Sequence, residues 1–353
     1  MSGVLNVGLI GSGWQARNHM RGYQQSGNAR IAAIANPNKE SVDKLINEFN
    51  LEGVKYYATH QDLLADKSIE AVSILTPNRF HEEMVIAGAE AGKHILAEKP
   101  FVTSIDGAKA VWAALKKSGV KCAIGYQRRL NPICKEIVRL RDNGTLGRLV
   151  FVQSDFFHGL PAWMPHWKWL TKKANNPTPF QSSGGHCVDT ITYLMNDEIA
   201  EVSAFSAHNL MPDSEVNMET CAIFRFKNGA IGKVASLSMK AVVSFEFPIE
   251  VFGTKGTMRN NKLILDTIPN YNDPKNKDNC IMYPNWSPDN TPGVTEPWDV
   301  MVMDFVDWVR GDSDGKELCK PKEAIRVFEA CWGTVISNEE HRVVKLPLIE
   351  DLD

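Results

Sequence analysis

The feature that most constrains this chain is an alternation of short apolar runs with amphipathic stretches over its first third. The apolar runs cover residues 4–10, 31–35, 71–75, 94–97 and 122–126. Between them, residues 39–49, 80–91 and 108–117 carry apolar side chains at helical spacing. Strands separated by helices of this length form βαβ units, whose strands run parallel. The first third is therefore predicted to be a doubly wound, parallel α/β sheet.

From residue 149 the pattern changes to strand-like runs with few helices between them. These runs cover residues 149–157, 202–207, 220–226, 230–238, 245–252 and 257–265. Strands in series predict a large, mostly antiparallel open sheet, typical of an α+β domain. Residues 266–297 are predicted to form a long loop, and helical patterns at 298–310 and 321–337 follow. We expect one domain over residues 1–126 and a second over residues 127–353.

Charge and composition exclude several classes of protein. The formal net charge is −3 and no long run of Lys and Arg occurs, which argues against nucleic-acid binding. No apolar stretch reaches membrane-spanning length, and the N-terminal residues lack a signal-peptide pattern, so a cytoplasmic protein is expected. The seven cysteines form no CxxC pair, and His and Asp show no compact ligand spacing, so no metal is expected.

A glycine-rich motif follows the first predicted strand and opens a helix. It runs Gly11-Ser12-Gly13-Trp14-Gln15-Ala16. Gly11 permits a tight turn, Gly13 lets the backbone approach a pyrophosphate, and the helix N-terminus offers free N–H donors. Its position in a βαβ series predicts dinucleotide binding, to which Trp14 and Gln15 are expected to contribute.

The end of the second predicted strand bears on the choice of cofactor. A carboxylate usually binds the ribose hydroxyls of NAD there, and this chain has Asn36 instead. Lys39 is a candidate contact for a 2′-phosphate, although a lysine at a helix start is usually just solvated. No arginine is present to clamp a phosphate. The expected cofactor is NAD or NADP, with a slight preference for NAD.

Two polar motifs follow later strands, at the edge where open α/β sheets bind their ligands. They are Thr76-Pro77-Asn78 with His81, and Glu98-Lys99-Pro100. We expect both motifs to contact the cofactor. The alternative for the second motif is an ordinary solvated turn.

Taken together, these motifs make the chain resemble the Gfo/Idh/MocA oxidoreductases, the relatives of glucose–fructose oxidoreductase and inositol dehydrogenase. The resemblance also rests on three further segments, namely residues 125–132, residues 144–147, and Gly185-His186 with Asp189. It implies a Rossmann domain followed by a sheet domain that forms a homodimer or homotetramer through its sheet. Only the loop at 266–297 matches poorly.

The resemblance implies that Lys99 and His186 are catalytic, with Asp189 one turn after the histidine. Many members carry an aspartate four residues before the histidine, where this chain has Ser182. The serine- and glycine-rich stretch before His186 predicts a helix start that places the histidine in the first turn. Ser182 is expected either to lie beside His186 or merely to cap this helix.

The resemblance also places candidate substrate contacts on three segments, one of which carries Ser182 and Asp189 around His186. Gln127 and Arg128 follow one strand, while Asp155 and His158 lie on another that lines the pocket. A polar pocket of this kind suits a sugar, an inositol or an anhydrosugar. Trp163, Trp167 and Trp169 are candidates for stacking on a sugar ring, although aromatic rows are more often core.

The expected reaction is oxidation of a secondary alcohol, in which a nicotinamide accepts the hydride. His186 is the expected general base, and Lys99 is the cation that stabilises alkoxide character. Two other classes stay open at this point. One is a glycosidase that uses bound NAD for transient oxidation, and the other is a non-catalytic cofactor-binding regulator.

Overall fold

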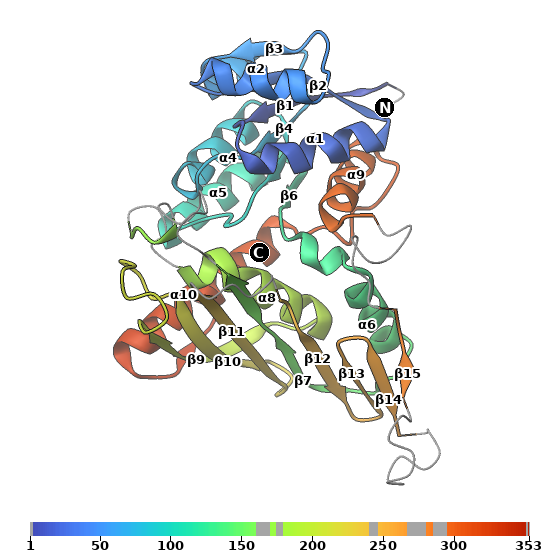
Figure 1. The fold of residues 1–353 in the computed structure, drawn as a ribbon, viewed down its shortest axis with the longest axis vertical. Helices are drawn as coiled ribbons and strands as arrows, with labels where there is room; N and C mark the ends of the chain where they lie inside the picture. The colour runs from blue at the N-terminus through green and yellow to red at the C-terminus, as the bar shows by residue number, and fades with distance from the viewer. Residues whose placement is uncertain are drawn as a thin grey trace. The chain divides into compact units, whose positions relative to one another are not determined.

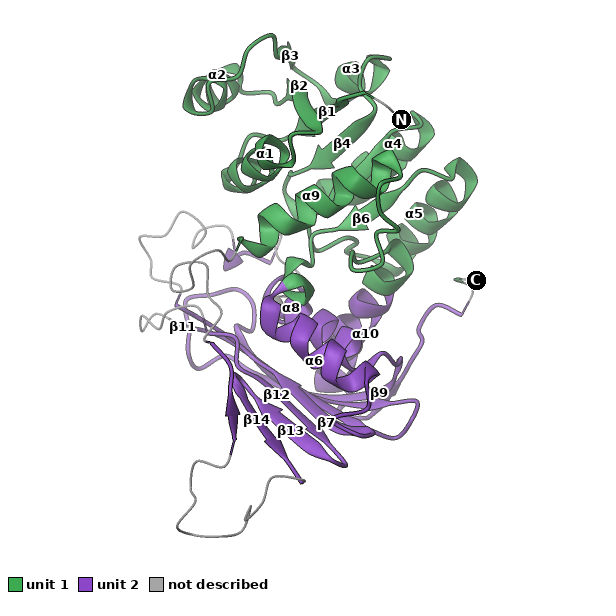
Figure 2. Cartoon of the chain, turned by 90° about the vertical axis from the view of Figure 1, so that its right-hand side faces the viewer, with its two compact units in different colours: residues 1–130, 295–325, 351–353 green, residues 131–294, 326–350 purple. Residues whose placement is uncertain are grey.

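The computed structural model describes residues 3–159, 170–173, 179–239, 246–266, 280–284, 295–350 and 352. The chain divides into two compact units (Figure 2). Unit 1 contains residues 1–130, 295–325 and 351–353, and unit 2 contains residues 131–294 and 326–350. Residues 295–325, which were expected in the second domain, therefore pack with the first.

Unit 1 is built on a six-stranded parallel sheet with the order β3-β2-β1-β4-β5-β6. Its strands are β1 (Leu5–Ile10), β2 (Ala29–Ala35), β3 (Lys55–Tyr57), β4 (Ala71–Ile74), β5 (His94–Ala97) and β6 (Cys122–Ile124). This strand order is that of the dinucleotide-binding Rossmann fold, so the predicted α/β sheet is confirmed. Strand β3 was not predicted, because its three residues, Lys-Tyr-Tyr, are too short to show a period.

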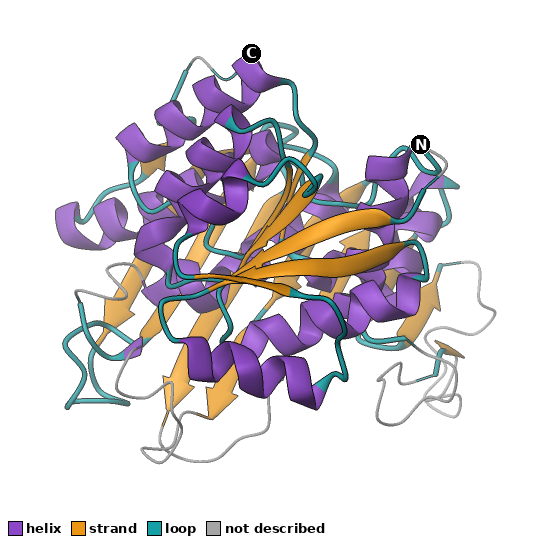
Figure 3. Cartoon of the chain, turned by 90° about the horizontal axis from the view of Figure 1, so that it is seen from above, coloured by secondary structure: helices purple, strands orange, loops and turns teal. Residues whose placement is uncertain are grey.

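Helices cover both faces of this sheet (Figures 1 and 3). They are α1 (Trp14–Ser26), α2 (Lys39–Glu48), α3 (His60–Ala65), α4 (His81–Glu90), α5 (Ile105–Ser118) and α9 (Pro297–Arg310), with short 3₁₀ turns at η1 (Asn78–Phe80) and η2 (Gln127–Leu130). Helix starts follow local capping rules. The side chain of Ser104, for example, accepts a hydrogen bond from the backbone N–H of Gly107.

Helix α9 joins unit 1 through close packing on α1. A Cβ atom at Gly22 of α1 would lie only 2.6 Å from Cβ of Val302, so the two helices meet where no side chain intervenes. The Arg21 guanidinium also bonds both carboxylate oxygens of the buried Asp299, at 2.9 and 2.8 Å. These contacts explain why a segment far along the chain belongs to the first unit.

Unit 2 contains a mixed sheet of ten described strands, in which only β11 pairs in parallel, with β7 and β8. The strands are β7 (Leu149–Ser154), β8 (Phe156–Gly159), β9 (Ile199–Ala207), β10 (Glu219–Phe226), β11 (Ile231–Met239), β12 (Ile249–Gly253), β13 (Gly256–Arg259), β14 (Lys262–Leu265), β15 (Ile281–Met282) and β16 (Val344–Lys345). The prediction of a large, mostly antiparallel sheet is confirmed.

Two predicted strands are each divided in the structure. The run at 149–157 breaks at Asp155, so that β7 and β8 are separate strands. The run at 257–265 is a hairpin, because Asn260 adopts a left-handed φ of 51° and turns the chain between β13 and β14. Asparagine tolerates this conformation better than most residues, so the Asn260-Asn261 pair was the missed turn signal.

The helices of unit 2 lie on one face of its sheet (Figure 2). They are α6 (Pro132–Asp142), α8 (Pro179–Met195) and the part of α10 (Pro321–Glu340) that follows residue 325. In the same sheet, Phe205 of β9 is 76% exposed and lies opposite Cys221 of β10. Within the described residues, no helix combines the length and apolar character needed to cross a bilayer.

Candidate active site

The glycine loop after β1 is shaped as a cradle for a phosphate group. Gly11 has a φ of +110°, and a Cβ there would lie 2.6 Å from the carbonyl oxygen of Leu75, so only glycine fits. Gly13 is the N-cap of α1 and makes no side-chain capping bond, and nothing lies within 4 Å of the position that a Cβ would take there. Open space therefore adjoins the first N–H groups of α1, as a bound pyrophosphate requires.

The two residues after Gly13 have different environments. Trp14 is 56% exposed, and its ring meets that of Trp298 edge to face, with 6.2 Å between centroids. The side-chain oxygen of Gln15 accepts a hydrogen bond from the Asn18 amide at 2.8 Å. Both residues begin α1 beside the cradle, at the positions for which cofactor contacts were predicted.

The turn after β2 holds the residues expected to discriminate between NAD and NADP. The Asn36 side-chain oxygen accepts a hydrogen bond from the backbone N–H of Asn38, so the two amide protons of Asn36 are left for other acceptors. The Lys39 ammonium lies 2.7 Å from both Asp43 carboxylate oxygens and 5.6 Å from the centroid of the Tyr56 ring. Lys39 is thus engaged in an exposed ion pair within α2.

His81 joins the two polar motifs at the ends of β4 and β5. Its Nε2 atom lies 2.7 Å from the carbonyl oxygen of Thr76, and its Nδ1 atom lies 2.7 Å from that of Pro100. The ring is buried, so His81 holds the two loops together rather than facing a ligand. Burial lowers the pKa of this imidazole, whereas the two carbonyl oxygens raise it in part. Pro77 is exposed and Asn78 is buried beside it.

Lys99 lies two residues after the end of β5, at the same edge of the sheet as the glycine loop. Burial lowers the pKa of its ammonium group, and the adjacent Glu98 carboxylate raises it in part. Glu98 itself is 4% exposed, and its Oε2 atom accepts a hydrogen bond from the backbone N–H of Lys99 at 3.2 Å. A partly buried ammonium at the sheet edge that also bears the glycine cradle has the environment of a catalytic group.

A buried polar network beneath Glu98 was not predicted from the sequence. The Nε2 atom of His19 lies 3.2 Å from Oε1 of Glu98, and its Nδ1 atom lies 3.0 Å from Oγ of Ser73. The signal available in the sequence was helical spacing, since His19 shares the buried side of α1 with Ala16 and Tyr23.

Gln127 and Arg128 follow β6, the next strand at this edge. Gln127 is buried, and its Oε1 atom has no hydrogen-bond partner among the described residues. Arg128 is partly buried. An amide oxygen that is buried without a partner is costly, which is consistent with a ligand group bound there.

In unit 2, His186 lies in the interior of α8 rather than in its first turn. The helix begins at Pro179, which makes His186 its eighth residue, so the expected helix start beside the histidine is wrong. Ser182 is likewise inside the helix and does not cap it. Ser182 and His186 are one turn apart and share a face, while Asp189 is fully buried.

Asp155 occupies the break between β7 and β8 and is saturated by neighbouring donors. Its carboxylate oxygens accept hydrogen bonds from Lys233 Nζ at 2.9 and 2.8 Å, from Gln153 Nε2 at 2.8 Å, and from the backbone N–H of Ala235 at 2.6 Å. The side chain is only 2% exposed. These contacts favour a structural role over the predicted substrate contact.

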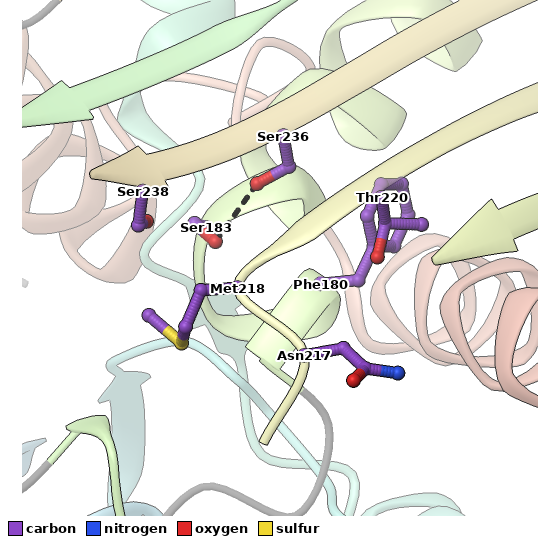
Figure 4. A pocket seen from close by; sticks show the side chains of 7 residues that line it. All are labelled: Phe180, Ser183, Asn217, Met218, Thr220, Ser236 and Ser238. Atoms are coloured by element: carbon purple, nitrogen blue, oxygen red, sulfur yellow. Dashed lines mark hydrogen bonds between the residues drawn. The ribbon is translucent and has the colours of Figure 1, made fainter. Parts of the chain in front are cut away.

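A small cavity lies between α8 and strands β10 and β11 (Figure 4). Its lining is mostly hydroxyl-bearing and consists of Phe180, Ser183, Asn217, Met218, Thr220, Ser236 and Ser238. Ser183 and Ser236 are joined by a hydrogen bond of 3.0 Å. His158 is buried on the neighbouring strand β8, opposite Ser238 in the strand register. Trp163, Trp167 and Trp169 lie outside the described residues.

Comparison with known families identifies the class of protein. Residues 5–126 match the oxidoreductase family with an NAD-binding Rossmann fold, GFO_IDH_MocA, and residues 134–259 match the GFO/IDH/MocA C-terminal domain. The chain belongs to the GFO/IDH/MocA oxidoreductase family. The resemblance drawn from the sequence motifs is therefore confirmed.

Individual members of the GFO/IDH/MocA family resemble the chain at moderate identity. It is 29% identical over 270 residues to the uncharacterized oxidoreductase YrbE of Bacillus subtilis, covering 73% of this chain and 74% of that protein. It is 27% identical to myo-inositol 2-dehydrogenase of Thermotoga maritima, covering 71% and 74%. The solved structure of levoglucosan dehydrogenase in complex with NADH aligns with a TM-score of 0.83, at 22% identity over 98% and 100% of the two chains.

The described residues contain no group of three or more His, Cys, Asp or Glu side chains that could hold a metal ion.

Proposed function

We propose that the protein is an NAD(P)-dependent dehydrogenase that oxidises a secondary hydroxyl of a sugar, an inositol or an anhydrosugar. The observation that carries this proposal is Lys99, whose pKa is lowered by burial at the sheet edge that also bears the glycine cradle. The name of the Thermotoga relative, myo-inositol 2-dehydrogenase, supports the substrate class.

The residues of unit 1 fit a dinucleotide. The backbone at Gly11 and Gly13 would hold the pyrophosphate, and the free amide protons of Asn36 would bond a ribose hydroxyl. When bound, the nicotinamide would supply the hydride acceptor. The exposed ion pair of Lys39 with Asp43 would have to break for the ammonium to reach the 2′-phosphate of NADP, which gives NAD only a slight preference.

Lys99 and His186 are the proposed catalytic residues. The Lys99 ammonium orients the hydroxyl and stabilises negative charge on its oxygen, and its lowered pKa lets it exchange a proton more readily than an exposed lysine does. His186 is the proposed general base, because a histidine changes its protonation state near neutral pH.

Gln127 and Arg128 are proposed to bond hydroxyls next to the reacting one. Support comes from the buried Oε1 atom of Gln127, for which the described part of the chain supplies no donor. His158, Ser182 and Asp189 remain proposed substrate-side residues of unit 2. Asp155 supports them indirectly, by fixing the break between β7 and β8.

The domain roles follow the same division. We assign cofactor binding to residues 1–126, together with the helix α9 that packs on α1, and substrate binding to the sheet domain within residues 127–353. The exposed Phe205 and Ile223 on strands β9 and β10 support assembly into a homodimer or homotetramer. A monomeric mass at micromolar concentration would contradict this assignment.

The test is a panel of inositols, aldoses, polyols and anhydrosugars, each with NAD⁺ and NADP⁺, followed by the absorbance of the reduced nicotinamide. We expect reduction of the cofactor with at least one cyclic polyol or sugar. Cleavage of a glycoside without net cofactor reduction would instead identify a glycosidase. Cofactor binding without turnover of any compound would identify a regulator.

A further inference from the structure

Four buried polar side chains of unit 1 form a continuous chain that ends at the residue before Lys99. Tyr23 Oη lies 2.7 Å from Ser73 Oγ, Ser73 Oγ lies 3.0 Å from His19 Nδ1, and His19 Nε2 lies 3.2 Å from Glu98 Oε1. His19 and Tyr23 come from α1, Ser73 from β4, and Glu98 from the end of β5. All four side chains are buried, with His19 at 0% exposure.

The donors and acceptors of this network can be assigned in one direction. The Nε2–H of His19 donates to Oε1 of Glu98, since a carboxylate oxygen is an acceptor. In the tautomer that carries its hydrogen on Nε2, Nδ1 accepts from the Ser73 hydroxyl, and Ser73 accepts from Tyr23. Burial raises the pKa of the Tyr23 hydroxyl, which keeps it protonated as the donor. The hydroxyl hydrogens of Tyr23 and Ser73 and the N–H of His19 are each donated to one acceptor, and the last acceptor is the Glu98 carboxylate.

The Glu98 carboxylate is confined where it can act on Lys99. Its second oxygen, Oε2, accepts from the backbone N–H of Lys99 at 3.2 Å. A Cβ at Gly125 would lie 3.1 Å from the carboxyl carbon, so the group is also packed against the end of β6. The carboxylate charge raises the pKa of the Lys99 ammonium, against the lowering by burial.

We infer that His19 is a positioning residue for Lys99, acting through the Glu98 carboxylate. The inference rests on the proposed function, in which Lys99 is catalytic. His19 does not touch a reacting atom; it fixes the carboxylate that stands beside the Lys99 backbone. Both ring nitrogens of the buried His19 have partners within the network, and the nitrogen that faces Glu98 fixes the position of its carboxylate.

Two substitutions separate these roles. In His19→Gln, the side-chain amide reaches the position of Nε2 and can still donate to Glu98. In His19→Asn, the shorter amide reaches only the position of Nδ1, so the bond to Ser73 can persist while the bond to Glu98 is lost. Met20→Leu is the matched control, because Met20 is buried on the same helix and lies outside the network.

The first measurement is steady-state turnover. We expect His19→Asn to lower kcat by about ten- to a hundred-fold, because a small displacement of a catalytic group is costly. The KM for the dinucleotide should stay within about two-fold, since the glycine cradle is unchanged. His19→Gln should recover most of kcat, and Met20→Leu should resemble the wild type.

The second measurement does not depend on a substrate. The rate at which a small amine-reactive reagent modifies Lys99 in the full chain is followed against pH by peptide mass spectrometry. Glu98 and His81 are titratable groups of unit 1 that interact electrostatically with Lys99. When the Glu98 carboxylate is held less firmly, it stabilises the Lys99 ammonium less. The pH midpoint of Lys99 modification should therefore fall by about half a pH unit or more in His19→Asn. It should stay near the wild-type value in His19→Gln.

The inference would be overturned if the pH midpoint of Lys99 modification were equal in all variants and kcat fell only as thermal stability fell. Equal kcat losses in His19→Gln and His19→Asn would also overturn it. If the wild type turns over no polyol but the midpoint shifts as expected, the proposed function fails while the positioning role of His19 stands.

Discussion

The ammonium of Lys233 lies 2.8 Å from the Asp155 carboxylate, which also accepts hydrogen bonds from Gln153 and Ala235 of the same unit. Because Asp155 is buried, Asp155→Asn leaves Lys233 without its counter-charge. We expect the free energy of unfolding to fall by about 2 kcal/mol, because Asp155 is buried while the charge left on Lys233 is partly exposed. Urea denaturation of single and double variants at both positions measures the coupling.

The exposed pair Lys172–Glu215 is the control for this ion pair. Its Nζ–Oε1 distance is 2.6 Å, yet both side chains are about half exposed. Glu215→Gln should therefore cost less than about 1 kcal/mol. Equal costs at the two pairs would contradict the structural role assigned to Asp155.

Lys99→Ala should lower kcat by about 10²- to 10³-fold, because it removes the charge that stabilises the developing alkoxide. The Kd for the reduced dinucleotide, measured by fluorescence, should change little, since the glycine cradle is intact. Lys67→Ala, at an exposed lysine before β4, is the control and should keep full activity. A near-normal kcat in Lys99→Ala would exclude a catalytic role for this lysine.

Asn36→Asp should shift the ratio of kcat/KM toward NAD by about ten-fold, because a carboxylate binds ribose hydroxyls and repels a 2′-phosphate. Asn38→Asp adds the same charge two residues on and preserves the cap of α2, where Asn38 accepts from the Ser41 N–H. It should shift the ratio less. If position 38 has the larger effect, Asn36 does not face the ribose.

Ser182→Asp should move the acid limb of the kcat/KM profile for alcohol oxidation to higher pH by about one unit. Ser182 and His186 are one turn apart inside α8, so a carboxylate at 182 would stabilise the imidazolium. Thr192→Asp, farther along α8, should leave the limb in place. If the acid limb of the kcat/KM profile stays in place in Ser182→Asp, the side chain at position 182 does not lie beside the catalytic base.

Lys320 should make stability depend on pH. Burial lowers its pKa from 10.5 to about 8, although its Nζ atom lies 3.3 Å from the centroid of the Trp308 ring. The folded state then binds fewer protons than the unfolded state between pH 8 and 10.5, so the free energy of unfolding rises with pH across that window. Since Lys320 is partly exposed, we expect about 1 kcal/mol. Lys320→Met should remove this increment in chemical denaturation at the two ends of the window. If Lys320→Met shows the same rise in the free energy of unfolding with pH, other titratable groups cause it.

Much of the architecture could be predicted from the sequence alone. The apolar runs of unit 1 became strands because their period and spacing are local properties, and Gly11 required glycine because its backbone is left-handed. The motifs also identified the family, since their order along the chain is itself sequence information. Lys99 and the residues of the glycine loop could be named for the same reason.

Which distant side chains contact one another is decided by the tertiary structure. Glu98 meets His19 from 79 positions away, and Asp155 meets Lys233 from 78 positions away. Helix α9 joins unit 1 because Gly22 admits Val302. Periodicity shows which face a side chain occupies, but not which distant segment packs there. That choice depends on strand order and close packing summed over the whole unit, so the roles of His19 and Asp155 emerged only from the tertiary structure.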